Sequence, residues 1–159
     1  MVVEVEHAER YWYPDDGGEV WVAGYQLVDP ESGAYLGRDA PLVAERGLHV
    51  AGVAGARHRE GALDGGALAP GSSLELRREP GNEFDANAIA VLAGGTQVGF
   101  VPRELAAELA GELDAGRPWA AIVLREQRPS PREPRSGVTM LLAPAEAIEL
   151  RVRPARRSR

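Results

Sequence analysis

Side chains able to bind a ligand gather around one turn of the sequence, in the stretch REPGNEFDANAIAV. They are Arg78, Glu79, Phe84, Asp85 and Asn87. An aromatic ring can stack on a nucleic-acid base, a guanidinium can bind phosphate, and a carboxylate can accept a hydrogen bond from a hydroxyl. A local explanation also exists: Asp85 and Asn87 can close an Asx turn, Phe84 can fill the core and Glu79 can pair with Arg78. The residues alone leave both interpretations open.

A second polar cluster, Arg57-His58-Arg59, follows an apolar stretch. Cations at this place could meet phosphates at the rim of a sheet. Surface arginines on a solvated loop are the commoner outcome for such a triplet, and this cluster taken alone favours that interpretation.

The sequence offers little for catalysis. The three histidines are His7, His49 and His58. They form no His-x-x-x-His pair, and the chain contains no lysine, which excludes a P-loop. Asp85-x-Asn87 resembles the start of a calcium loop but lacks the later glycine and glutamate. We therefore predict no catalytic residue, no metal, no cofactor and no enzymatic activity. A small hydrolase or nuclease built from Asp85, Glu79 and His58 is the weakest alternative.

Length and composition are those of a single globular domain. The chain has 159 residues, 44% of them hydrophobic and 26% charged, and no cysteine. No apolar run is long enough to span a membrane, and the acidic N-terminus lacks the apolar core of a signal peptide. These features predict a cytoplasmic location without membrane contact.

Charge is distributed unevenly along the chain, whose net charge is −6. Residues 1–46 hold three arginines and ten acidic residues, whereas residues 123–159 hold nine arginines and four acidic residues. All basic residues are arginine, which suits bidentate phosphate contacts, although a coding bias explains it equally well. We predict an acidic N-terminal extension (1–46), a central domain (47–152) and a basic flexible tail (153–159).

Apolar alternation and turn residues predict many short strands. The N-terminal residues 1–18 are expected to be irregular, and a hairpin is expected over 19–37. A connector over 38–47 precedes a buried strand at 48–55 and a glycine-rich loop at 56–72. Further strands are expected at the segments 73–79, 87–93, 96–102, 118–126 and 138–152, the last broken at Pro144. A tight turn at Gly94-Gly95 joins one pair, and a Pro- and Arg-rich loop at 127–137 joins another.

One helix is expected over residues 103–116. Leu105, Leu109 and Leu113 recur at helical spacing, with Pro102 at its start and Gly116 at its end. The chain is therefore predicted to be mainly β, a compact barrel or sandwich with one short α-helix and an N-terminal β-hairpin extension.

The segments from LHVAGVAGARHR, through REPGNEFDANAIAV and VGFVPRELA, to PWAAIVL resemble the HIRAN domain family. They cover residues 48–124, about half of the chain, and their order and separation are fairly specific. Members of the family occur at the N-terminus of helicase-like DNA-repair translocases and as short free-standing proteins. The resemblance implies a small OB-like or SH3-like β-barrel that recognises the 3′ end of single-stranded DNA.

The resemblance also implies roles for individual residues. Arg57 would contact the terminal nucleotide, His58 would stand at the place of an aromatic stacker, and Arg103 would hold a backbone phosphate. Phe84 and Phe100 would provide stacking or apolar contact, and Asp85 would accept a hydrogen bond from the free 3′-hydroxyl. Asn87 would support the Asp85 turn.

The preferred interpretation is thus a non-catalytic module for single-stranded DNA with a free 3′ end. Remodelling or cleavage would come from a protein partner such as a helicase or nuclease. The main alternative is a protein-interaction module that keeps the barrel without DNA binding. Its contact surface would be the aromatic N-terminal hairpin, which contains Tyr11, Trp12, Tyr13 and Trp21.

Overall fold

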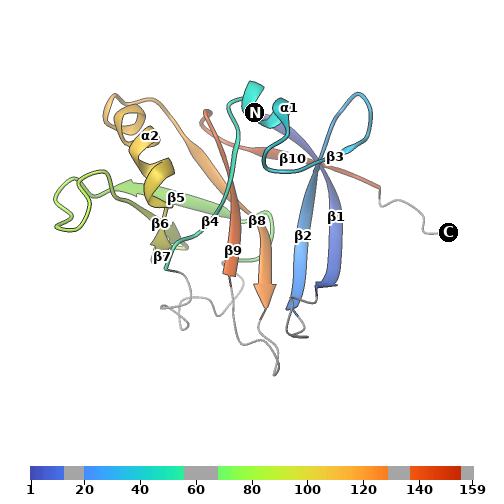
Figure 1. The fold of residues 1–159 in the computed structure, drawn as a ribbon, viewed down its shortest axis with the longest axis horizontal. Helices are drawn as coiled ribbons and strands as arrows, with labels where there is room; N and C mark the ends of the chain where they lie inside the picture. The colour runs from blue at the N-terminus through green and yellow to red at the C-terminus, as the bar shows by residue number, and fades with distance from the viewer. Residues whose placement is uncertain (13–19, 56–67, 129–136, 155–159) are drawn as a thin grey trace.

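The computed structural model describes residues 1–12, 20–55, 68–128 and 137–154 (Figure 1). This part of the chain contains ten strands and two helices. In chain order they are β1 (Val2–Trp12), β2 (Val20–Val28), β3 (Tyr35–Leu36), α1 (Pro41–Glu45), β4 (His49–Gly52), β5 (Ser73–Arg78), β6 (Ile89–Ala93), β7 (Thr96–Phe100), α2 (Arg103–Asp114), β8 (Ala120–Arg128), β9 (Gly137–Ala143) and β10 (Glu149–Arg153).

The mainly β class is confirmed, and most predicted strands form. The antiparallel hairpin of β6 and β7 turns at Gly94 and Gly95, whose φ angles of 57° and 84° need residues without a Cβ. β5 alternates as expected, since Leu74 is buried while Glu75 and Arg77 are exposed. The expected 19–37 hairpin corresponds to β2 and β3, which pair antiparallel around the turn after Val28.

The prediction of an irregular N-terminus is wrong, because residues 2–12 form β1. β1 pairs antiparallel with β2 and parallel with β10. Val3 and Val5 are buried, and the intervening Glu4 meets arginines of β10, Arg151 at 3.4 Å and Arg153 at 2.9 Å. One of the acidic residues that suggested an irregular segment, Glu4, is thus neutralised by cations from the other end of the chain, Arg151 lying 147 positions away.

Of the two helices in the described residues, one was predicted from the sequence and the other was not. α2 occupies the predicted place, burying Leu109 with Leu105 and Leu113 packed partly against the core. The connector over 38–47 contains an additional short helix, α1, of five residues. Neither helix in the described ranges has the length and apolar character needed to cross a membrane.

The sheet is not closed into the expected barrel. The principal strand order is β10-β1-β2-β8-β5-β6-β7, with β9 paired to β8 and β4 paired to β9. The two ends of the path β4-β9-β8-β5-β6-β7 meet only at the isolated bridge between Ala54 and Phe100, as far as the described residues show. Residue 54 donates to and accepts from Phe100 at 2.7 and 2.9 Å. One bridged pair therefore replaces a continuous ladder.

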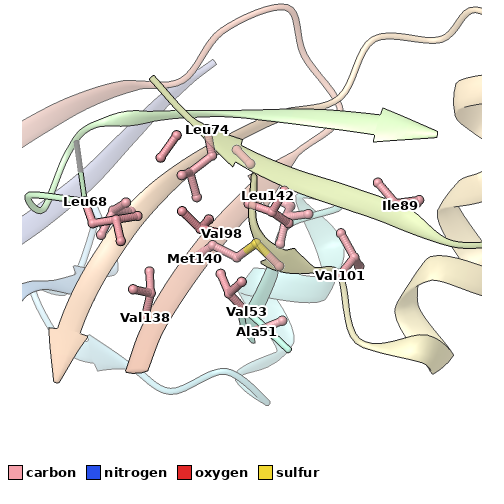
Figure 2. Packing of buried hydrophobic residues seen from close by; sticks show 14 of the residues in the cluster. Ala51, Val53, Leu68, Leu74, Ile89, Val98, Val101, Val138, Met140 and Leu142 are labelled. Atoms are coloured by element: carbon pink, nitrogen blue, oxygen red, sulfur yellow. The ribbon is translucent and has the colours of Figure 1, made fainter. Parts of the chain in front are cut away.

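Two hydrophobic cores share the strands β8 and β9. The first core, which includes Ala121, Val123, Met140 and Leu142, is enclosed by β4 to β9 and α2 (Figure 2). The second core contains the alternate residues Ile122, Leu124, Leu141 and Ala143, together with Val3, Val5, Leu27 and Val43. Because successive side chains of a strand point to opposite faces, β8 and β9 are buried on both sides.

The N-terminal residues are consequently joined to the rest of the fold. β2 pairs with β8 over residues 21–24, and Gly24 allows a close crossing, because a Cβ there would lie 2.2 Å from the Leu124 carbonyl oxygen. The domain limits at 46 and 152 stay a prediction. Most of the two predicted loops (56–72 and 127–137) and of the basic tail lies outside the described residues.

Candidate nucleic-acid interface

Two consecutive Asx turns shape the loop between β5 and β6. The Asn82 Oδ1 atom accepts hydrogen bonds from the backbone N–H groups of Phe84 (2.9 Å) and Asp85 (3.1 Å). The Asp85 Oδ1 atom then accepts from the backbone N–H of Asn87 at 2.9 Å. Short Asx side chains favour such local bonds. The local interpretation of Asp85 is therefore confirmed, but it uses only one of the two carboxylate oxygens.

Asn82 is the bracing residue that the sequence-based interpretation missed. Its amide nitrogen donates to Glu79 Oε1 at 3.1 Å, so the side chain ties both sides of the loop. Asn87, predicted to support the turn, does so through its backbone N–H. Any residue except proline could provide this donor, so the interaction does not depend on the asparagine side chain. An Asn two and three positions before the bonded N–H groups is the sequence signal for this arrangement.

Phe84 lies on the surface and does not fill the core. Its exposed fraction is 81%, the largest among the exposed large hydrophobic residues of the described chain. Phe84 stands on a turn whose backbone is fixed by the Asn82 side chain, which accepts from the N–H groups of Phe84 and Asp85. An apolar ring exposed on a braced turn is available for contact with another molecule.

The second oxygen of Asp85 faces Arg103, the first residue of α2. The Asp85 Oδ2 and Arg103 Nε atoms are 3.9 Å apart, which is an ion pair but too long for a hydrogen bond. The Asp85 side chain is 21% exposed and that of Arg103 is 80% exposed. A partly shielded carboxylate and a solvent-facing guanidinium thus lie side by side next to Phe84.

Arg78 and Glu79 do not pair with each other. The Arg78 guanidinium donates to Asp114 Oδ1 at 2.9 Å and to the Ala88 carbonyl oxygen at 2.9 Å. The hydrogen bond from Arg78 lowers the pKa of Asp114 below its usual value, against the opposing effect of desolvation. Arg78 therefore anchors the C-terminal end of α2 to β5, and its role in the fold is structural.

Phe100 ends β7 and is half-buried. Its backbone forms the bridge to Ala54, and Gly99 permits this contact, because a Cβ on Gly99 would lie 2.4 Å from the Ala54 carbonyl oxygen. Val101 donates to Ile89 at 2.9 Å, which places the chain leading into Arg103 beside the start of β6.

The remaining predicted contacts, Arg57 and His58, lie outside the described residues. The structure thus brings Phe84, Asp85 and Arg103 together on neighbouring segments, with Phe100 on the adjoining strand. Glu79, one part of the hydrolase alternative, hydrogen-bonds Asn82. Within the described ranges, no group of three or more His, Asp or Glu side chains is arranged to hold a metal ion.

Two solved structures are similar to the chain. The HIRAN domain of human HLTF is 24% identical with a TM-score of 0.43, and the match covers 62% of this chain and 78% of that one. A protein from Lactobacillus plantarum is 22% identical with a TM-score of 0.41, covering 59% of this chain and 91% of that one. No curated protein matches the chain significantly. The family model of the HIRAN domain matches residues 47–134, more than half of the sequence, and the chain belongs to the HIRAN domain family.

Proposed function

We propose that this protein is a non-catalytic module that binds single-stranded DNA and recognises its free 3′-hydroxyl end. Membership of the HIRAN domain family supports nucleic-acid binding. The finer preference, for a single strand and for its 3′ end, is what the resemblance of the sequence to this family implies, and the chemistry of the loop between β5 and β6 supports it.

The observation that carries the proposal is the divided use of the Asp85 carboxylate. Oδ1 is occupied by the Asn87 N–H, whereas Oδ2 lies 3.9 Å from Arg103 and keeps its capacity to accept a hydrogen bond. A 3′-hydroxyl can donate to such an oxygen, and a hydrogen bond to a charged group contributes about 1.5–3 kcal/mol. A 3′-phosphate at neutral pH offers no equivalent donor and is repelled by the carboxylate. Asp85 would therefore favour the hydroxyl end.

Phe84 and Arg103 complete a site for the terminal nucleotide. The exposed ring of Phe84 can stack on any base, which contributes about 1–3 kcal/mol without sequence preference. The solvent-facing Arg103 can contact a backbone phosphate while it limits the repulsion from Asp85. In the proposal Phe100 adds apolar contact from the adjoining strand, and Arg57 and His58 add contacts from the segment that follows Ala54.

Net charge argues for a local contact rather than extensive coating of DNA. The chain carries −6 overall, and residues 47–122 hold six arginines against ten acidic residues. Non-specific binding depends on the number of neutralised phosphates. We therefore propose weak binding focused on the strand end, with a helicase or nuclease partner acting on the presented terminus.

The decisive experiment compares three labelled oligonucleotides of one sequence by fluorescence anisotropy. They are a single strand ending in 3′-hydroxyl, its 3′-phosphate counterpart and a blunt duplex. We expect the hydroxyl strand to bind at least about tenfold more tightly than the phosphate strand. Equal affinity for the two strands contradicts end recognition. Absence of binding to all three favours the protein-interaction alternative, and cleavage in the presence of magnesium contradicts the non-catalytic assignment.

A further inference from the structure

β10 is an edge strand, and no described strand pairs with its outer side. It stands at the end of the strand order and pairs with β1 alone among the described strands. In Figure 1 its C-terminal end lies at the periphery of the molecule, where the chain leaves the sheet. An open edge presents unpaired backbone groups to other chains.

The direction of these backbone groups follows from the pairing with β1. The backbone N–H of Glu149 donates to the Met1 carbonyl oxygen at 2.9 Å, so Glu149 faces β1. Because backbone groups alternate in direction along a strand, Arg151 and Arg153 also face β1, whereas Leu150 and Val152 direct their N–H and C=O groups outward. The open edge therefore offers two donors and two acceptors.

The side chains of β10 are suited to an identical partner. Glu149, Arg151 and Arg153 share one face, and Leu150 and Val152 share the other. In an antiparallel pair of two β10 strands, the outward-directed residues of both copies must meet, which allows registers centred on Leu150, Arg151 or Val152. The registers centred on Arg151 and Val152 place arginines directly opposite each other, which is unfavourable. The register centred on Leu150 instead places Glu149 opposite Arg151 of the other copy, whose side chain is 66% exposed, and two-fold symmetry repeats this contact.

Val152 gives this edge an apolar contact as well. Its exposed fraction is 48%, while the neighbouring Leu150 packs partly against the second core. Pairing of two copies would cover Val152 with the apolar face of the second strand. Arginines on an edge usually discourage such pairing, but here their effect is offset by Glu149 on the same face.

We propose that β10 is a self-association surface through which two copies of this chain form a continuous sheet. The partner is a second copy, because the strand carries both members of the Glu149–Arg151 pair within its five residues. The proposal is independent of DNA binding, since it uses none of the residues of the loop between β5 and β6. A dimer of this kind would present two copies of that loop.

The test is sedimentation velocity of the full chain over micromolar to millimolar concentrations. We expect a reversible monomer–dimer equilibrium for the unaltered chain. Val152→Pro removes an outward-directed N–H that β1 does not use, and proline is tolerated at such edge positions. This variant should raise the dissociation constant of the dimer at least about tenfold.

Charge reversal provides an independent variant. Glu149→Arg places an arginine opposite Arg151 in the register centred on Leu150, so it should weaken the dimer to a similar extent. Glu146→Arg changes the charge equally at an exposed position outside β10 and should leave the equilibrium unaltered. The melting temperature and circular dichroism of each variant show that its fold is retained. A chain that stays monomeric throughout, or a dimer that survives both β10 variants in folded form, overturns the proposal.

Discussion

Arg103 Nε lies 3.9 Å from Asp85 Oδ2, and the arginine side chain is 80% exposed while the carboxylate is 21% exposed. The two residues belong to different elements: Asp85 to the turn before β6, and Arg103 to the first turn of α2. A second ion pair, from Arg78 to Asp114, joins β5 to the other end of the same helix. The site residues are therefore held by a helix that is attached at both ends to the β5–β6 segment.

The carboxylate charge of Asp85 should control discrimination at the strand end. Asp85→Asn keeps the Oδ1 acceptor for the Asn87 N–H but removes the charge. The ratio of the affinity for the 3′-hydroxyl strand to that for the 3′-phosphate strand should therefore fall towards one. The melting temperature of Asp85→Asn should change little, whereas Asp85→Ala also loses the turn bond, a cost of about 0.5–1.5 kcal/mol. Anisotropy titrations and thermal melts measure both effects. Asp39→Asn, at an exposed position, is the matched control, and undiminished discrimination in Asp85→Asn contradicts the assigned role.

Arg103 should contribute to the salt dependence of binding. If it contacts one phosphate, Arg103→Ala should reduce the slope of log K against log salt by about 0.7, the value for one contact on a single strand. Arg38→Ala removes the same charge at an exposed position of the β3–α1 connection and should leave the slope nearly unchanged. Titrations at several salt concentrations provide the slopes. Identical slopes for the Arg103 variant and the unaltered chain exclude a phosphate contact.

Gly99 should be intolerant of any side chain. A Cβ there would lie 2.4 Å from the Ala54 carbonyl oxygen and 2.6 Å from Val53 Cγ1. Gly99→Ala should therefore lower the free energy of unfolding by about 1–3 kcal/mol, as expected for overpacking. Gly111→Ala, in open space on α2, should instead raise it by about 0.5–1 kcal/mol. Urea denaturation measures both, and a neutral Gly99→Ala would show that the Ala54–Phe100 bridge is dispensable.

The Arg78–Asp114 pair should make stability depend on pH in the acidic range. Hydrogen bonding from Arg78 holds the pKa of Asp114 below 3.8, so the contribution is complete above about pH 4 and is lost as the pH falls through the lowered pKa. Asp114→Asn should therefore melt at a lower temperature than the unaltered chain at pH 7, and the difference should shrink towards about pH 2. Glu108→Gln, exposed on the same helix, serves as control. A difference that stays constant with pH argues against the ion pair.

The sequence by itself determined the local elements. Glycines at positive φ, apolar alternation and the spacing of Leu105, Leu109 and Leu113 are local signals, and they located the β6–β7 hairpin and α2. The motif around Asp85 also identified the family and the Asx turn. Such features depend on interactions within a few residues, which the order of the chain contains directly.

Tertiary structure decided what these elements contact. The strand β1 was hidden by its acidic residues, and the cationic partners of one of them, Glu4, come from the other end of the chain as Arg151 and Arg153. The open sheet with one bridged pair depends on the close approach of Gly99 to Ala54, which no local pattern encodes. The proximity of Arg103 to Asp85 likewise requires α2 to dock against the β5–β6 segment, as the Arg78–Asp114 pair does at its other end. Side-chain burial and ion pairing are set by packing between distant segments, and only the folded chain brings those segments together.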